Sequence, residues 1–245
     1  MKIFGFLTKN ENRFIHVTCN IILGSIVLIV FALSFFAPVS AQMVSGGNSA
    51  IYCGNKDKNN VSLMINVYWG TEYLDDILSV LDSNNVKTTF FVGGSWVARN
   101  NEMLLKIAER GHEIGNHGYN HKNHDKISSA LSQEEIEKTS ALIEAVIGKA
   151  TSLFAPPSGA VNSRVVSDAE SLNHKTIMWT KDTIDWRDKD SNLVFKRATE
   201  GIENGSLILM HPTAHTLEAL DRVIKNLKGQ GFNPTTVSEC IDGVC

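Results

Sequence analysis

The stretch Gly111–His121 reads GHEIGNHGYNH and combines a helix end, a short strand and a pair of histidines. Gly111 stands where the preceding helix should close, because glycine adopts the left-handed conformation that ends many helices. The segment Glu113–His117 predicts a strand. His117 and His121 are four residues apart, so one helical turn would bring both imidazoles to a single metal ion. Surface histidines often share this spacing, so the pair makes a metal site a hypothesis.

Strand-like and amphipathic segments alternate on both sides of this stretch. The strand-like runs are Val61–Trp69, Lys87–Gly93, Glu113–His117, Ser152–Pro156, Lys175–Asp182, Ser206–Pro212 and Thr235–Val237. The helical segments include Tyr73–Leu81, Met103–Ala108, Ile136–Ile147 and Leu217–Leu227. Ser132 and Glu135 form a sequence pattern typical of a capping box at a helix start. The alternation predicts an α/β domain with a parallel sheet, either a barrel or a doubly wound sheet. In both, functional side chains lie at the carboxyl ends of the strands.

Two more polar groups fall at predicted strand ends. Asp182 and Asp185 lie where a strand becomes a loop, and His211 closes an apolar strand. An imidazole held by a carboxylate has a raised pKa and can deliver a proton. We therefore predict Asp182 and His211 as an acid pair. A solvated acidic loop and a core histidine are the structural alternatives.

Five motifs in this order resemble the polysaccharide deacetylases, the NodB-homology fold of carbohydrate esterase family 4. The motifs are Lys87–Gly94 (KTTFFVGG), Gly111–His117 with His121, Ala155–Gly159 (APPSG), Asp182–Trp186 (DTIDW) and Leu207–His211 (LILMH). The resemblance implies a distorted (β/α) barrel. It also implies the removal of N-acetyl groups from amino sugars of cell-wall polysaccharide, either peptidoglycan or chitin-like oligomers. The variant Trp69-Gly70-Thr-Glu72 is most similar to the sporulation-type branch of the family.

The resemblance also implies roles for individual residues. In the family a divalent ion, usually zinc, is held by one aspartate and two histidines and binds the attacking water. His117 and His121 match the metal-binding histidines. His211 matches the general acid, and Asp182 matches the carboxylate that orients it. The residues expected to contact substrate are Trp186, Pro157, Ser158 and Asp185. We expect His124, a further histidine nearby, at the surface.

The pattern breaks at the two acids of the first motif. That motif normally ends its strand with two adjacent aspartates, the base and then a metal ligand, but here the residues are Asn66 and Val67. An amide cannot accept a proton at neutral pH, and valine cannot bind a metal. The arginine that normally pairs with the base is Ala155. Because an unpaired buried arginine would cost on the order of several kcal/mol, these losses are coherent with one another.

Two functions therefore stay open. The first is an impaired metal-assisted hydrolase that takes its base or metal ligand from Glu72 or Asp185. Losing a general base typically costs about 10²–10⁴-fold in rate, which allows residual turnover if the metal stays bound. The second is an inactive protein that binds cell-wall glycan. The retained pair of Asp182 and His211 favours the hydrolase class.

The N-terminal segment carries signals for export. Lys2, Lys9 and Arg13 precede an apolar run at about residues 21–39, and a Val-Ser-Ala site follows. This pattern is typical of a cleaved secretory signal, while the length of the run also fits an uncleaved membrane anchor. We assign residues 1–41 to this signal or anchor, 42–60 to a linker and 61–241 to the deacetylase-like domain. The protein should act outside the cell or at the cell-wall face, and should touch a membrane only through the N-terminal segment.

Charge and cysteine content narrow the remaining possibilities. The chain has 245 residues and a formal net charge of -3, and the absence of a basic run in the sequence argues against nucleic-acid binding. Export permits a disulfide from Cys53 to Cys240 or Cys245. Free thiols fit the sequence equally well.

Overall fold

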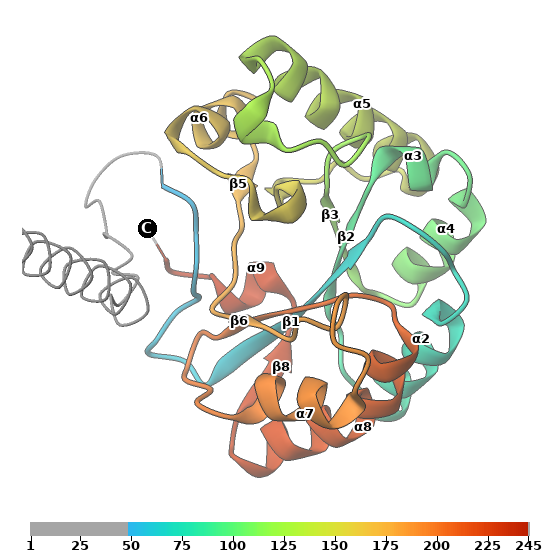
Figure 1. Ribbon diagram of the computed structural model, residues 1–245, viewed down its shortest axis with the longest axis vertical. Helices are drawn as coiled ribbons and strands as arrows, with labels where there is room; N and C mark the ends of the chain where they lie inside the picture. Colours follow the sequence, from blue (N-terminus) through green and yellow to red (C-terminus); the bar gives the residue numbers. More distant parts are fainter. Residues whose placement is uncertain (1–48, 245) are drawn as a thin grey trace, which may run out of the picture. The chain divides into compact units, whose positions relative to one another are not determined.

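The computed structural model describes residues 49–244, which form an α/β domain on a curled parallel sheet (Figure 1). The strands are β1 (Asn60–Val67), β2 (Thr89–Val92), β3 (Glu113–Asn116), β4 (Leu153–Phe154), β5 (Lys175–Thr176), β6 (Lys181–Asp182), β7 (Leu207–Met210) and β8 (Asn233–Thr235). Their order is β5-β4-β3-β2-β1-β7-β6, and β8 pairs with the start of β1. All of these pairings are parallel. The α/β class and the distorted barrel predicted from the sequence are confirmed.

Strand β1 lies inside this sheet between β2 and β7 and is buried on both faces. Alternate residues of β1 point to the core between the sheet and the helices, and they are Val61, Leu63, Ile65 and Val67. Met64 points the other way and joins Phe91 in the core inside the curled sheet. A parallel strand covered on both faces needs apolar residues at nearly every position, which explains the run LMINV.

Helices surround the sheet, as Figure 1 shows. They are α2 (Leu74–Ser83), α3 (Gly94–Val97), α4 (Asn101–Glu109), α5 (Ser129–Ile147), α6 (Ser163–Ser171), α7 (Ser191–Thr199), α8 (Ala214–Gly229) and α9 (Val237–Cys240), with short 3-10 helices η1 (His124–Lys126) and η2 (Pro157–Gly159). The predicted apolar face of α2 is buried as expected. Helix α5 begins earlier than predicted, because Ser128 is its N-cap and accepts a hydrogen bond from Leu131 N. Ser132 and Glu135 are therefore buried inside the helix and do not form the predicted capping box.

The prediction of one strand over Lys175–Asp182 was wrong, because this segment forms the two separate strands β5 and β6. β5 pairs with β4, whereas β6 pairs with β7, so the two strands lie at opposite ends of the sheet order. One straight segment cannot pair with both ends, so the chain crosses the seam between them. Ile51 fills part of this seam by bridging to Ile177. The last part of the predicted linker thus belongs to the domain.

Most of the features predicted for the N-terminal segment lie outside the described residues. The apolar run at residues 21–39, the cleavage site and Cys245 lie outside the described residues. Within residues 49–244, no helix has both the length and the apolar character needed to cross a membrane. Cys53 and Cys240 carry free thiols.

Candidate functional site

The predicted polar residues gather at the carboxyl ends of the strands. His117 follows β3, His211 follows β7, and Asp182 is the last residue of β6. Asn66 is the next-to-last residue of β1. Because the strands are parallel, these ends meet at one rim of the curled sheet, where the functional groups of such folds lie.

The histidine pair lies in a loop. The ring centroids of His117 and His121 are 5.1 Å apart, so the prediction that the two rings lie together is confirmed. Their proximity does not come from a helical turn, because the segment is irregular and His121 has a left-handed φ of 53°. Burial, aided by the nearby His121, lowers the pKa of His117 to about 3, so this imidazole is neutral at neutral pH. His117 Nδ1 lies 2.7 Å from Ala155 O and must donate to it, which leaves Nε2 with a free lone pair.

A buried carboxylate on α5 holds this loop in place. Glu135 Oε2 accepts hydrogen bonds from Tyr119 N at 2.9 Å and from Asn120 N at 2.6 Å. The Asn120 side chain donates to the other oxygen of the same carboxylate at 3.2 Å. His124, which we expected at the surface, is fully buried instead. Its Nδ1 lies 2.9 Å from Ser132 Oγ, and its ring packs against Phe154. His124 thus connects the end of the loop to α5 and β4.

The carboxylate that orients His211 is Asp185, and the predicted pairing with Asp182 was wrong. Asp185 is 1% exposed, and its Oδ1 lies 2.7 Å from His211 Nδ1. Its Oδ2 accepts from His211 N and from Thr216 Oγ1, both at 2.6 Å. Nδ1 therefore carries the proton donated to Asp185, and His211 Nε2 is the ring atom left for another partner.

Asp182 takes part in the turn that follows its strand. Its Oδ1 accepts a hydrogen bond from Ile184 N at 2.8 Å, which closes a tight turn after β6. Ile184 has a left-handed φ of 53°, and this turn directs Asp185 toward the interior. Asp182 lines a shallow pocket of about 380 Å³ beside α7, together with Lys181 and Arg197. Among the described residues, no hydrogen bond joins Asp182 to His211, whose Nδ1 pairs with Asp185.

Aromatic rings cover the rim between the histidines. The Trp69 ring is parallel to the His211 ring, with an angle of 7° between their planes and 6.3 Å between centroids. It meets His121 edge-on at 6.1 Å, and Tyr68 lies 4.7 Å from the same histidine. Trp69 is 53% exposed, and Trp186, after β6, is 54% exposed. The sequence pattern had marked Trp69 only as a branch feature. Because Trp69 comes two residues after a buried strand, the sequence could have placed it at the rim where the strands end.

The remaining predicted substrate residues lie beside the histidine loop. Pro157 is buried in η2, and its ring lies 3.4 Å from the position that a Cβ on Gly118 would take. Ser158 has a left-handed φ of 56° and is exposed. The described structure thus places Pro157 near the predicted metal pair, with Ser158 at the surface next to it.

The donor set does not fit the family's metal ion. Among residues 49–244, histidine, cysteine, aspartate and glutamate nowhere come together in a group of three or more that could hold a metal. Glu72 and Asp185 therefore do not complete a site with His117 and His121, contrary to our suggestion. Val67, at the position of the family's carboxylate ligand, is fully buried in the core under the helices.

The side-chain oxygen of Asn66, at the position of the family's base, has no hydrogen-bond partner among the described residues. The residue is 5% exposed, and its Oδ1 is buried without a partner among the described residues. Ala155, at the position of the arginine, is fully buried. The site therefore keeps one complete pair, His211 with Asp185. Its other polar residues are the amide Asn66 and the two histidines His117 and His121.

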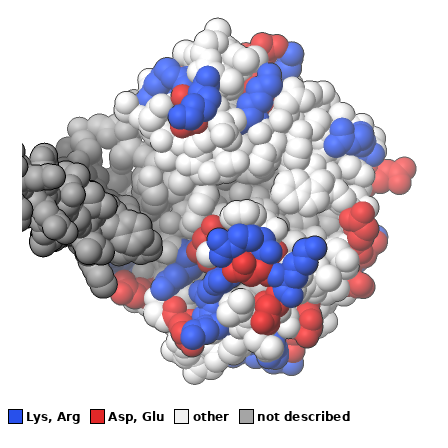
Figure 2. Space-filling model, in the orientation of Figure 1, with Lys and Arg blue, Asp and Glu red and all other residues white. Residues whose placement is uncertain are grey.

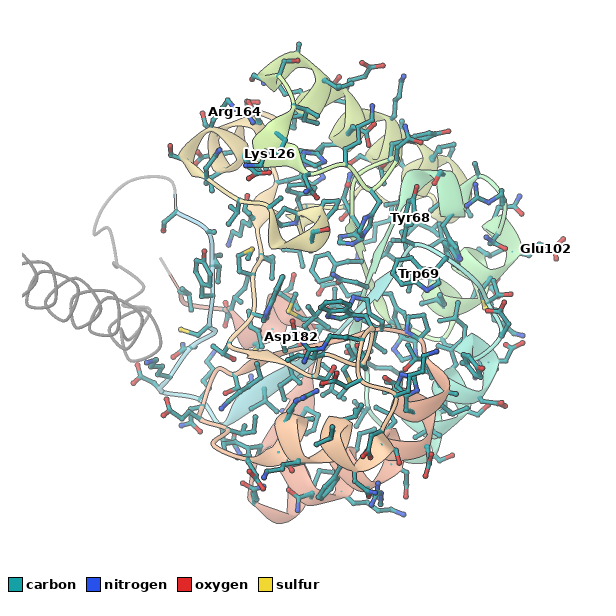
Figure 3. All side chains as sticks on the ribbon, viewed as in Figure 1. Tyr68, Trp69, Glu102, Lys126, Arg164 and Asp182 are labelled. Carbon is teal, nitrogen blue, oxygen red and sulfur yellow. The ribbon has the colours of Figure 1, made fainter. Side chains whose placement is uncertain are left out.

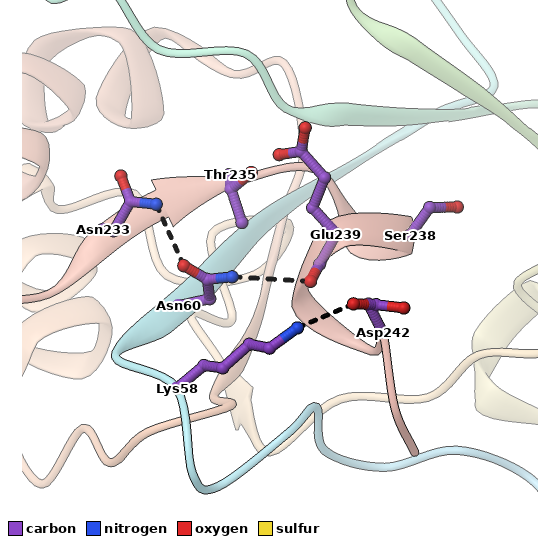
Figure 4. A pocket seen from close by; sticks show the side chains of 7 residues that line it. All are labelled: Lys58, Asn60, Asn233, Thr235, Ser238, Glu239 and Asp242. Carbon is purple, nitrogen blue, oxygen red and sulfur yellow. Dashed lines mark hydrogen bonds and ion pairs between the residues drawn. The ribbon is translucent and has the colours of Figure 1, made fainter. Parts of the chain in front are cut away.

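The face shown in Figure 2 is charged in patches above and below, with an uncharged band between them. Tyr68 and Trp69 lie in the middle of this face in Figure 3, which has the same orientation. A separate pocket of about 570 Å³ lies at the opposite ends of β1 and β8 (Figure 4). Across its edge Lys58 Nζ pairs with Asp242 at 2.7 Å. This pocket is remote from the histidines because it lies where the strands begin.

Comparison with protein families identifies one matching model. The polysaccharide deacetylase model matches residues 54–177. Among curated proteins, YlxY of Bacillus subtilis, described as uncharacterized, is 44% identical over 192 residues, covering 78% of this chain and 60% of YlxY. The peptidoglycan-N-acetylglucosamine deacetylase PgdA of Listeria monocytogenes is 35% identical, covering 66% of this chain and 34% of PgdA. The chain thus spans less than two thirds of the length of either relative.

Solved structures give a similar result. The wild-type structure of BA3943, a CE4 family pseudoenzyme from Bacillus anthracis, is 41% identical with a TM-score of 0.78. The match covers 80% of this chain and 70% of that one. A BA3943 mutant described as having restored enzymatic activity is 39% identical with the same TM-score, and the match covers 80% and 72% of the two chains.

Proposed function

Because the chain belongs to the polysaccharide deacetylase family, we propose that it binds N-acetylated cell-wall glycan at the rim of its barrel and has lost metal-assisted deacetylation. The observation that carries this proposal is the composition of the broken site. An unpaired amide and a buried valine stand where the family places its base and its carboxylate ligand. Two imidazoles without a carboxylate would hold a divalent ion weakly.

Several features of the rim support glycan binding. Tyr68 lies beside His121, and Trp69 lies beside His121 and His211. Aromatic rings pack well against the apolar faces of sugar rings. PgdA is described as a peptidoglycan deacetylase and BA3943 as a pseudoenzyme, which matches the two halves of the proposal. Peptidoglycan is the glycan that we propose for this chain.

The acid pair supports a second candidate, a slow hydrolase. Asp185 accepts hydrogen bonds from His211 N and Nδ1, so in the doubly protonated imidazole Nε2 would be the atom that gives a proton to a leaving amine. The water-activating half is the part that is missing. This candidate predicts trace acetate release that depends on His211.

The two candidates are separated by measuring binding and turnover on the same protein. The purified full-length chain is incubated with insoluble peptidoglycan and with N-acetylglucosamine oligomers, with and without added zinc or cobalt. We expect sedimentation with peptidoglycan that a chelator does not reduce, and no more acetate release than from His211→Ala. Leu105→Ala, on the exposed side of α4, is the control for non-specific loss of binding.

Two results would contradict the proposal. Acetate release well above the His211→Ala level, rising with added metal, would make the chain an active deacetylase. Failure of the wild-type chain to sediment with peptidoglycan would remove the binding function.

Export of the protein belongs to the same proposal. The charged N-terminal flank, the apolar run and the Val-Ser-Ala site support secretion or anchoring at the cell-wall face. A role in sporulation is supported by the Trp69–Glu72 sequence variant. Mass determination of the protein released from its native cell would show whether cleavage follows Ala41.

A further inference from the structure

Cys53 and Cys240 are far apart in the sequence, but the fold brings their two segments together. Cys53 lies in the segment before β1, and Cys240 is the last residue of α9. Asn55 N donates to Cys240 O at 2.8 Å, so the backbone just after Cys53 runs along the end of α9. Figure 1 shows this start of the described chain, in blue, beside its end, in red.

Gly54 shows how near the Cys240 side chain comes to this segment. A Cβ added to Gly54 would lie 2.6 Å from Cys240 Sγ and 2.4 Å from Cys240 O, so only glycine fits at this position. Gly54 N also donates to Gly205 O at 2.7 Å, which holds the segment in place. Consecutive Cα atoms are about 3.8 Å apart, so Cys53 begins one residue away from the contact with Cys240.

The two thiols differ in exposure and in reactivity. Cys53 is partly exposed, whereas Cys240 is fully buried, and its thiol donates to Asn60 O at 3.6 Å. Burial, and after it the nearby Cys53, raises the pKa of the Cys240 thiol to about 12. An effect of one thiol on the other requires that the two sulfurs lie near each other. Because the thiolate is the reactive form of cysteine, an oxidant from outside should react first at Cys53.

We propose that Cys53 and Cys240 form a disulfide in the exported chain, which links the segment before β1 to α9. Both thiols are free in this structure, which therefore describes the reduced form. The inference rests on the proposed export, because disulfides form and persist in oxidising surroundings outside the cell. It does not depend on glycan binding.

The oxidant is a second disulfide, either in an oxidising thiol–disulfide oxidoreductase or in glutathione disulfide. The Cys53 thiolate attacks one sulfur of that disulfide, forms a mixed disulfide and releases the other sulfur as a thiolate. Cys240 then passes its proton to water and displaces the oxidant from the Cys53 sulfur. Two thiols of this chain are thereby oxidised to one disulfide, and the disulfide of the oxidant is reduced to two thiols.

Oxidation should stabilise the domain, because the bridge closes a loop that contains nearly all of its strands and helices. The full-length chain is purified with reduced thiols, and half of it is oxidised with glutathione disulfide at a mildly alkaline pH. We expect the midpoint of thermal unfolding to be about 5–15 °C higher in the oxidised form. Peptide mapping without reductant should show one linked pair of peptides, which contain Cys53 and Cys240.

Serine variants provide the matched controls. Cys53→Ser should unfold at the same temperature in oxidising and in reducing buffer. Cys245→Ser, which removes the neighbouring cysteine at the end of the chain, should keep the full difference. Cys240→Ala is a second variant that removes the partner without adding a buried hydroxyl, and it should lose the difference as Cys53→Ser does.

The same mapping on the protein from its native cell decides whether the bridge forms there. The free thiols are blocked with N-ethylmaleimide as the cells are opened, so that no bridge forms afterwards. A Cys53–Cys240 linkage in this sample would support the inference. Blocked thiols at both positions, or a bridge from Cys53 to Cys245, would overturn it, whatever the result of the peptidoglycan binding experiment.

Discussion

At the scale of single residues, the partner of His211 shows what a sequence pattern can and cannot predict. Asp182 ends β6 and Asp185 follows it, and the family motif contains both. The structure selects Asp185 because Ile184 adopts a left-handed conformation, which turns the third residue inward. Side-chain types do not encode this turn, since isoleucine rarely adopts a positive φ. The sequence therefore predicted that a carboxylate near the end of β6 pairs with His211, but it did not identify which aspartate does so.

Replacing each aspartate in turn by asparagine tests whether Asp185 is the partner of His211. Asp185→Asn removes a buried charge that accepts from His211 and Thr216, and we expect it to lower the free energy of unfolding by about 2–4 kcal/mol. Asp182→Asn, the matched control, should cost less than about 1 kcal/mol, because this side chain accepts one hydrogen bond at a partly exposed position. Urea denaturation measures both. Equal losses would contradict the assignment of Asp185.

At the scale of elements, the histidine loop depends on helix α5. The sequence predicted the His117–His121 pair from its spacing, which the structure confirms as proximity. It also predicted that Ser132 and Glu135 would cap a helix. They instead hold the loop, because Ser128 one turn earlier takes the cap. The Glu135 carboxylate, about two turns inside the helix, accepts hydrogen bonds from backbone amides of a separate loop, and such a long-range contact has no local sequence signal.

Glu135→Gln should loosen this loop without unfolding α5. The amide would replace a charge-assisted acceptor for two backbone N–H groups, which we expect to cost about 1–3 kcal/mol. Hydrogen exchange at Tyr119 and Asn120 should become faster, as amide-resolved exchange would measure. Glu134→Gln is the matched control, since Glu134 is exposed and pairs only with Lys138 among the described residues. Unchanged exchange at both amides in Glu135→Gln would contradict the anchoring role.

At the scale of the whole molecule, buried histidines make the domain sensitive to acid. Burial lowers the pKa of His112 and of His124 to about 4, against 6.5 in the unfolded chain. Between these values the unfolded chain binds more protons than the folded one, so stability is full above pH 6.5 and falls as the pH drops toward 4. Each group contributes roughly 3 kcal/mol over this window.

The urea midpoint should therefore fall steeply between pH 6.5 and pH 4. His112→Gln should reduce that slope, because glutamine can still accept the hydrogen bond from Thr88 N but does not titrate in this range. A slope equal to that of the wild type would show that His112 does not drive the acid sensitivity.

The alternation of strand-like and helix-like segments predicted the parallel sheet of the whole domain. Each strand and helix buries one or both faces in this fold, so its apolar residues recur with a period that the sequence shows. The seam was not predicted, since Lys175–Asp182 has a continuous strand pattern. Its division into β5 and β6 follows from closure of the sheet, to which every strand contributes.

The seam also determines how the domain responds to mechanical load. Ile51 is held there by two hydrogen bonds, from its N to Thr176 O and from Met178 N to its O, both of 2.8 Å. Gly54 N and Asn55 N then bond to Gly205 O and Cys240 O. A chain tethered through its N-terminus, at a membrane or within the wall, would transmit tension to these bonds first. While Cys53 and Cys240 stay reduced, these bonds would yield one after another before β1 is loaded, so this short segment would absorb extension and spare the rim that carries the histidines.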